Sequence, residues 1–149
     1  MSGAGTSLIA FKTALVDRLG ERPGLAGVAV LYARSDVDSL PDEAIWLEKA
    51  ETESLEFPAF RPTKMELQEV YDLDVTVQVR LTQGQTQRQA DARALELLAE
   101  LQQQLAEAPQ LCDDIQWAKP ESWKYHGGQL DSGHGCRFDI VVRVHARME

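Results

Sequence analysis

The sequence lacks the segments that direct a protein into or across a membrane. No apolar run approaches the ~20 residues that a membrane-spanning helix needs, and the N-terminus has no basic segment leading into an apolar one. We therefore expect a protein that is made in, and resides in, a cytoplasm-like compartment and binds no membrane.

Cysteine is scarce as well. Cys112 and Cys136 are the only two, and their spacing matches no ligand or redox motif. The chain has 149 residues, 44% of them hydrophobic, and a chain of this length buries a core without disulfides. We predict two free thiols, with a single disulfide as the alternative. The length also favours one domain that spans residues 1–149.

Positive charge is in short supply. Fifteen Lys and Arg residues against 24 Asp and Glu residues give a net charge of −9. The segment from Asp36 to Glu56 holds eight acids and only Lys49 as a base. A nucleic-acid-binding protein needs a basic stripe that displaces counterions from phosphates, so we expect no sequence-specific binding of DNA or RNA. The acidic segment fits either a solvated surface or a wall past which DNA slides without sticking.

Residues with catalytic or metal-binding chemistry are few. All three histidines lie in the last 24 residues. His126, His134 and Cys136 are of metal-ligand type, but their spacing matches no zinc pattern and a fourth ligand would have to come from elsewhere. The glycines around them predict a loop over residues 126–135. We therefore predict no metal, no cofactor and no enzymatic activity.

A long alternating segment, residues 71–81, is the clearest structural signal. Its apolar residues take every second position: Tyr71, Leu73, Val75, Val77, Val79 and Leu81. Period two predicts a strand with one dry and one wet face. At ~3.3 Å per residue it is about 36 Å long and could project beyond its own domain. Leu67 and Glu69 share the parity of Tyr71, so we expect either an exchange of the two faces or a bulge near Glu69.

A helix and two shorter strands are predicted before this segment. Thr6 or Ser7 caps a helix whose apolar residues recur at helical spacing as far as Gly20. The uncharged run over residues 27–33 predicts a short strand that is buried on both faces or at an interface. A polar loop over residues 35–41 follows.

The next strand is predicted over residues 43–52. Ile45 and Leu47 face the core in this strand, and Trp46 lies on the less buried side, either as a partial core residue or as part of a contact surface. The prolines of residues 58–62 predict a turn before the long strand.

A second helix and two strands are predicted after it. Thr86 and Gln89 form a capping box, and the apolar stripe behind it is Ala90, Ala94, Leu97, Leu98, Leu101 and Leu105. The opposite face of this helix, which includes Gln104, is predicted to be polar surface. Residues 115–125 predict an edge strand because Pro120 cannot donate to an inner ladder. The alternating residues 138–147 predict the last strand.

These elements predict an α/β (α+β) domain with the order α-β-β-β-α-β-β. The sheet is expected to be mixed and mainly antiparallel, with about four to five strands. Both helices should lie on one face, because the long strands and the helices each have one apolar side to bury.

The sequence resembles the tail terminator (tail completion) proteins of long-tailed phages, in the form met in phages of actinobacteria. The resemblance covers nearly the whole chain in order, and rests on Val28-x-Val30-x-Tyr32, Pro41-Asp-Glu-Ala-Ile-Trp-Leu47, Glu69-x-Tyr71-x-Leu73-x-Val75, the capped helix from Thr86 and the closing strand. It implies a subunit of a ring, commonly a hexamer, that caps the tail tube, ends tail growth and meets the head connector. It also implies residence in the virion, assembly in the host cytoplasm, and DNA passing through the ring.

Four residues are expected at the interface with another subunit or with the tail tube. Trp46 and Val141 are apolar residues on wet strand faces, where the contacts of a ring are to be sought. Glu69 and Tyr71 belong to the segment that carries the resemblance. Within such a ring we expect acidic side chains to face the DNA and apolar ones to make the contacts. The alternatives are a small cytoplasmic α/β domain that binds a ligand or partner and, behind it, an unrecognised hydrolase.

Overall fold

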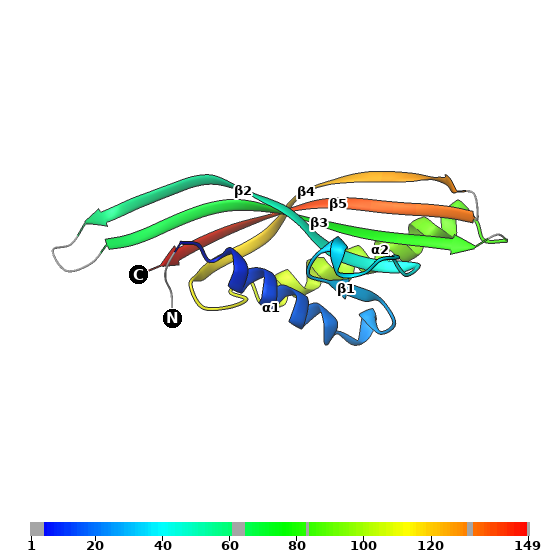
Figure 1. Cartoon of the computed structure of the whole chain (residues 1–149), viewed down its shortest axis with the longest axis horizontal. Helices are drawn as coiled ribbons and strands as arrows, with labels where there is room; N and C mark the ends of the chain where they lie inside the picture. Colours follow the sequence, from blue (N-terminus) through cyan, green and yellow to red (C-terminus); the bar gives the residue numbers. More distant parts are fainter. Residues whose placement is uncertain (1–4, 61–64, 83, 131–132, 149) are drawn as a thin grey trace.

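Two helices cover one face of a five-stranded sheet in the computed structural model, which describes residues 5–60, 65–82, 84–130 and 133–148 (Figure 1). The sheet order is β1-β2-β3-β5-β4, with β1 parallel to β2 and every other neighbouring pair antiparallel. This confirms the predicted fold class and element order. The elements are α1 Leu8–Gly20, η1 Pro23–Leu25, β1 Ala29–Leu31, η2 Arg34–Asp36, β2 Glu43–Phe60, β3 Met65–Thr82, α2 Gln87–Glu107, β4 Ile115–Leu130 and β5 Gly133–Met148.

The core lies between the two helices and the central strands. β3 and β5 pair without interruption from Leu67 opposite Met148 to Thr82 opposite Gly133. The predicted alternation is confirmed, because the odd residues of β3 and the even residues of β5 bury their side chains under the helices while the others face outward. Fully buried strand residues include Leu73, Val75, Val77, Val79, Val142 and Val144.

Glu69 lies on the helix-facing side of β3, like the other odd-numbered residues of this strand. β3 neither exchanges its faces nor bulges against β5 there, and the register shift lies in β2, between Thr52 and Ser54. The Glu69 side chain is 2% exposed, since it turns toward the start of α1 and finds its partners there. A charged side chain occupies a buried strand position because hydrogen bonds replace its lost solvation.

Helix α1 begins where the sequence predicts, at Ser7, but the cap differs. The Ser7 hydroxyl donates to Glu69 Oε1 (2.7 Å) instead of closing the first turn, and the Ser7 backbone N–H donates to the same oxygen (2.7 Å). Thr6 Oγ1 accepts from the Leu8 N–H (3.1 Å). Thr6 therefore supplies one local bond at the start of α1, and a carboxylate from β3 supplies the others, at the helix end that favours negative charge.

Helix α2 confirms its capping box and its apolar stripe. Thr86 Oγ1 accepts from the Gln89 N–H, and the Gln89 side chain accepts from the Thr86 N–H. The prediction that Gln104 lies on the polar surface of this helix is wrong, because the residue is only 5% exposed. Its side-chain oxygen accepts from Arg22, which also pairs with Glu100 (2.7 Å), so the segment after α1 is fastened over the end of α2.

Two strand predictions need correction, one about burial and one about length. β1 is only half-buried, because it pairs with β2 on one side and forms the sheet's edge on the other. β2 continues to Phe60 through Pro58, where a turn was predicted. The absent proline N–H is tolerated since β2 has no strand on its other side there and its register shifts between Glu56 and Ala59.

The predicted loop over residues 126–135 is mostly sheet. β4 runs to Leu130 and β5 begins at Gly133, so the two strands form a long hairpin. Gly127 serves a close approach here, because a Cβ at this position would overlap the Tyr125 hydroxyl. The glycines predicted a loop here, but Gly127 and Gly128 lie within β4.

The β2–β3 hairpin extends past the layer of helices at one end of the molecule (Figure 1). The apolar residues of 71–81, the segment predicted to project, instead lie in or against the core, so the part of the strand that extends is not the predicted one. Both cysteines are free thiols, as predicted. None of the helices in the described part of the chain is long and apolar enough to cross a membrane.

Candidate assembly surface

The sheet face opposite the helices, called here the open face, is rich in charge. Arg143 on β5 donates to Asp72 on β3 (3.1 and 3.3 Å) and also pairs with Glu53 on β2 (2.6 Å). Half-exposed ion pairs of this kind add little stability, but they fix the positions of charges across three strands. The charges are therefore mostly balanced within the face.

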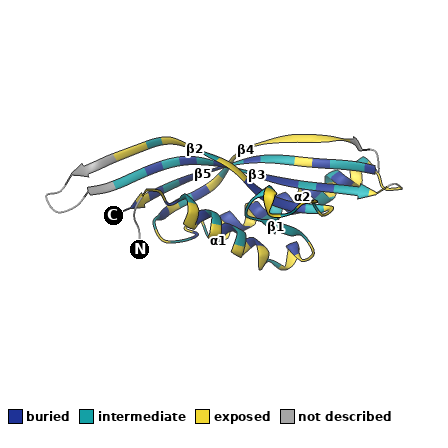
Figure 2. Cartoon of the chain, in the orientation of Figure 1, coloured by how far each residue is buried: buried dark blue, intermediate teal, exposed yellow. Residues whose placement is uncertain are grey.

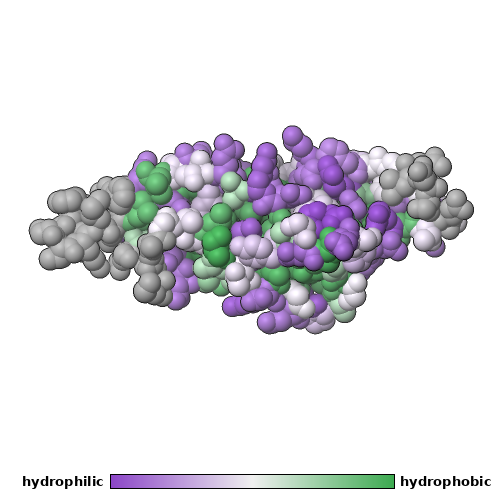
Figure 3. Space-filling model, in the orientation of Figure 1, coloured by the Kyte–Doolittle hydropathy of each residue, from purple (hydrophilic) through white to green (hydrophobic). Residues whose placement is uncertain are grey.

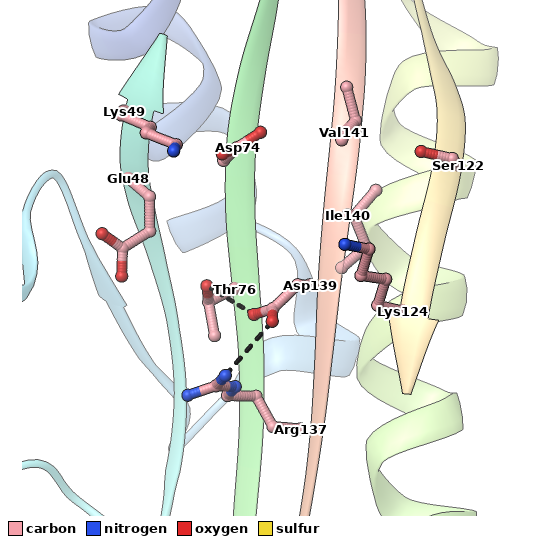
Figure 4. Close-up of a pocket in the computed structure, with 10 residues that line it drawn as sticks. All are labelled: Glu48, Lys49, Asp74, Thr76, Ser122, Lys124, Arg137, Asp139, Ile140 and Val141. Atoms are coloured by element: carbon pink, nitrogen blue, oxygen red, sulfur yellow. Dashed lines mark hydrogen bonds and ion pairs between the residues drawn. The ribbon is translucent and has the colours of Figure 1, made fainter. Parts of the chain in front are cut away.

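A second set of charges surrounds Asp139, beside a half-open hollow of about 360 Å³ (Figure 4). Asp139 accepts from Thr76 (3.1 Å) and pairs with Arg137 and His126 (both 3.2 Å). Asp74 lines the same hollow, and its pKa is raised by burial, with Lys49 opposing the rise. Charges of both signs neutralise one another here, which gives the hollow little attraction for a charged ligand.

Trp46 lies on the face predicted for it, but it is not exposed. Its side chain is 4% exposed, and its ring N–H donates to Glu48. Trp46 pairs with Thr76 of β3 on one side and with Leu31 of β1 on the other. The expectation that Trp46 sits on a less buried side is therefore wrong, since β2 is paired on both sides at this residue and η2, which follows β1, also contacts β2.

Glu69 and Tyr71 also lie inside the chain. The Tyr71 side chain is 2% exposed, its hydroxyl lies 3.0 Å from Ser7 Oγ, and burial raises its pKa. Together with Thr6, these residues tie the start of α1 to β3. Val141 differs from the other three expected interface residues, since it is half-buried on the open face and lines the hollow.

The residues considered for metal binding do not converge. His126 lies on the open face beside Asp139, whereas Cys136 is buried on the helix side, where burial and the nearby Asp91 raise the pKa of its thiol to about 12. No group of three metal-ligand residues occurs in the part of the chain that the structure describes.

An exposed aromatic group on the helix side of β4 was missed. Trp123 is 60% exposed and Tyr125 is 44% exposed, and both rings contact Phe138 of β5. The Tyr125 hydroxyl donates to Asp91 of α2 (2.9 Å), which places the group beside that helix. The sequence feature that could have predicted this group is the alternation of Trp123 and Tyr125 within a strand expected at the sheet edge.

The opposite edge of the sheet is also exposed. Leu55 of β2 is 54% exposed on the helix side, opposite Glu69. The exposed segments of β2 and β4 lie toward opposite ends of the molecule (Figure 2). Figure 3 shows hydrophobic residues in separate groups on one side of the molecule, with hydrophilic residues between them. The surface therefore offers small apolar sites set among charges.

No protein-family model matches this sequence, and no curated protein matches it. Among solved structures, the chain is similar to one described as "Virion of native gene transfer agent (GTA) particle". The TM-score is 0.64 at 17% sequence identity, and the alignment covers 97% of this chain and 99% of that one. At this identity the likeness is one of fold, and it extends over the whole length of both chains.

Proposed function

We propose that this protein is a tail terminator, a structural subunit that forms a ring on the finished tail tube of a phage or phage-like particle. The observation that carries the proposal is the fold shared over the full chain with a protein of a gene transfer agent virion. The sequence resemblance to tail terminators points the same way independently. The proposed role is structural and involves no catalysis.

The shape and charge of the subunit support this role. A hairpin that outreaches the helix layer can contact a neighbouring subunit or the tube beneath it (Figure 1). A net charge of −9 suits a ring through which DNA passes without being retained. The proposed partners are other copies of this chain, the tail tube protein and the head connector, at the head–tail junction of the virion.

Of the expected interface residues, Val141 is the best placed for direct contact, because part of its side chain is exposed on the open face. Trp46, Glu69 and Tyr71 are buried and would act by holding β2, β3 and α1 in shape. We expect Trp46→Ala to weaken self-association by loosening the support of β2.

Deletion of the gene in a strain that produces particles tests the proposal. Tails of uncontrolled length, or tails that fail to join heads, are expected by electron microscopy, with normal particles restored by the intact gene. Labelled antibody should bind at the head–tail junction. Tails of normal length joined to heads in the deletion strain would contradict the proposal.

A further inference from the structure

Two edges of the sheet lack a partner strand among the described residues. β4 ends the sheet on one side, and on the other side β1 pairs with β2 only as far as Trp46. From Leu47 onward, β2 therefore presents its backbone donors and acceptors at an edge. Long exposed edges pair with another chain unless something prevents it. Pro120 interrupts the β4 edge and Pro58 interrupts the β2 edge, because proline has no N–H to donate. The segments of the two edges beside these prolines are therefore the sites where a second chain can bind.

The helix side of both edges carries exposed apolar side chains. On β4, Trp123 lies opposite the buried Ile140 and Tyr125 reaches α2, which fixes their side of the sheet. On β2, Leu55 lies opposite Glu69, whose carboxylate turns to α1. Each edge thus has apolar surface on the same side of the sheet.

The open side of the two edges carries opposite charge. Lys119 and Lys124 of β4 lie opposite Arg143 and Asp139, residues of the open face, and Glu121 is the one acid of that strand. β2 carries five glutamates against Lys49, although Glu43 lies on the helix side, where it pairs with Arg93, and Glu53 pairs with Arg143. Four of these glutamates are exposed, and two of the four, Glu51 and Glu56, lie opposite Asp72 and Gln68 of the open face.

We propose that the β4 edge of one copy pairs with the β2 edge of the next, so that the sheet continues from subunit to subunit. Because side chains keep their side in a continuous sheet, Leu55 would lie beside Trp123 and Tyr125, and the glutamates beside the lysines. The occupant of each edge is a second copy of this chain.

Like charges exclude the other pairings. Two β4 edges would bring lysines together, and two β2 edges would bring glutamates together, at a cost that disfavours both contacts. The remaining contact is heterologous, and heterologous contacts generate rings when the rotation closes. The inference rests on the proposed ring and supplies its subunit contact. It assigns Glu51 to that contact, whereas the sequence suggested that acidic side chains face the DNA.

Charge reversal tests the pairing. We expect Lys119→Glu with Lys124→Glu, or Glu51→Lys with Glu56→Lys, to weaken self-association about tenfold or more by sedimentation velocity. An equimolar mixture of the two variants should restore association. The acidic β4 edge of one variant can then pair with the basic β2 edge of the other, and the remaining two edges, which are unchanged, can pair as in the original protein. A merely structural defect would not be repaired by mixing.

Matched controls carry the same change in net charge on exposed residues in the helices or, for Glu21, directly after one. They are Arg18→Glu with Arg88→Glu, and Asp17→Lys with Glu21→Lys, and both should associate like the original protein. Trp123→Ser should weaken association while the circular dichroism spectrum stays unchanged, since this side chain is 60% exposed.

Cross-linking covers the case in which association of the free protein is weak. Copies with and without ¹⁵N are mixed at high concentration and treated with a carbodiimide, which joins lysines to carboxylates in contact. Links between Lys119 or Lys124 of one copy and Glu51 or Glu56 of another are expected. Cross-links confined to other strands, or none between copies, would overturn the proposal.

The two proposals fail in different ways. Rings that form unchanged by either reversal would overturn the edge contact and leave the tail terminator role intact. Edge contacts that form as described, together with normal tails in the deletion strain, would overturn the role and leave the contact.

Discussion

Glu69 is a charged residue placed where the alternation of β3 demands an apolar one. Its carboxylate accepts hydrogen bonds from the Ser7 N–H and hydroxyl and from the Thr6 hydroxyl. Hydrogen bonds to a charged group contribute about 1.5–3 kcal/mol, and removing the carboxylate also leaves buried donors without a partner. The residue therefore fastens α1 to the sheet.

We expect Glu69→Ala to lower the free energy of unfolding by about 2–4 kcal/mol, measured by urea denaturation. Ser7→Ala should cost less, because the Ser7 backbone N–H would still reach the carboxylate. Glu51→Ala serves as the control and should change stability by less than about 0.5 kcal/mol, since its side chain is exposed. Equal effects of Glu69→Ala and Glu51→Ala would show that the buried carboxylate contributes nothing.

Cys136 makes the stability of the folded protein depend on pH in the alkaline range. Burial first, and Asp91 second, raise the pKa of its thiol to about 12 from the ordinary value of 9.0. The folded state thus holds this proton after the unfolded chain has released it. Stability from this group is complete below the unfolded pKa and is lost as pH rises from about 9 toward 12.

The expected outcome is that the free energy of unfolding falls between pH 9 and pH 12, and falls less steeply in Cys136→Ala. Tyr71, whose pKa burial also raises, adds to the decline in both proteins. Denaturation at a series of pH values measures the two slopes. Identical slopes would mean that the Cys136 thiol ionises as readily in the folded protein as in the unfolded one.

At the scale of elements, α2 is fixed to the sheet by one stripe of leucines and alanines. Leu97 and Leu101 are fully buried against the core strands, whereas Leu95 on the same helix is 58% exposed. Burial of this kind provides most of the stability of a helix in a folded protein. Comparing alanine substitutions at these three leucines therefore separates the contribution of core packing to stability from that of helix propensity.

Leu97→Ala or Leu101→Ala should lower the free energy of unfolding by about 2–5 kcal/mol, through lost transfer energy and the cavity left behind. Leu95→Ala is the matched control, with an expected change under about 0.5 kcal/mol. A loss under half a kilocalorie in both buried variants would contradict the packing described for this helix.

Hydrogen exchange should follow the order of the strands. β3 and β5 are paired on both sides, so the amides of Val75, Val77, Val142 and Val144 should exchange among the slowest in the protein. Amides of the outer edge of β4 should exchange much sooner in the free subunit. Fast exchange at the four valines would contradict the sheet order.

At the scale of the whole molecule, the protein is an elongated sheet with helices on one face and exposed edges toward its two ends (Figure 2). Such a unit has two different surfaces to offer to its neighbours, which is the requirement for a closed ring.

Tail terminator rings are commonly hexamers, so for the proposed ring light scattering should give a mass near six times 16.6 kDa, either for the free protein or in the presence of tail tube protein acting as a template. Both measurements are needed, because a ring that depends on the tube leaves the free subunit monomeric. A monomer under both conditions would contradict the ring.

The sequence by itself determined the order of the elements, the capping box of α2, and the faces of α2, β3 and β5. These features follow from periods of 2 and 3.6 residues and from contacts within a single turn, which neighbouring residues encode directly. Only the tertiary structure decided where Glu69 finds its hydrogen-bond donors, why Gln104 is buried, and how Trp46 is enclosed. The partners of Glu69 and Gln104 lie more than 60 residues away along the chain, and Trp46 is covered by its neighbours in the fold, so no local pattern contains them. Pro120 marked β4 as an edge strand in the sequence, whereas only the fold decided that β2 stays open beyond Trp46, because that edge is defined by the strand that is missing beside it.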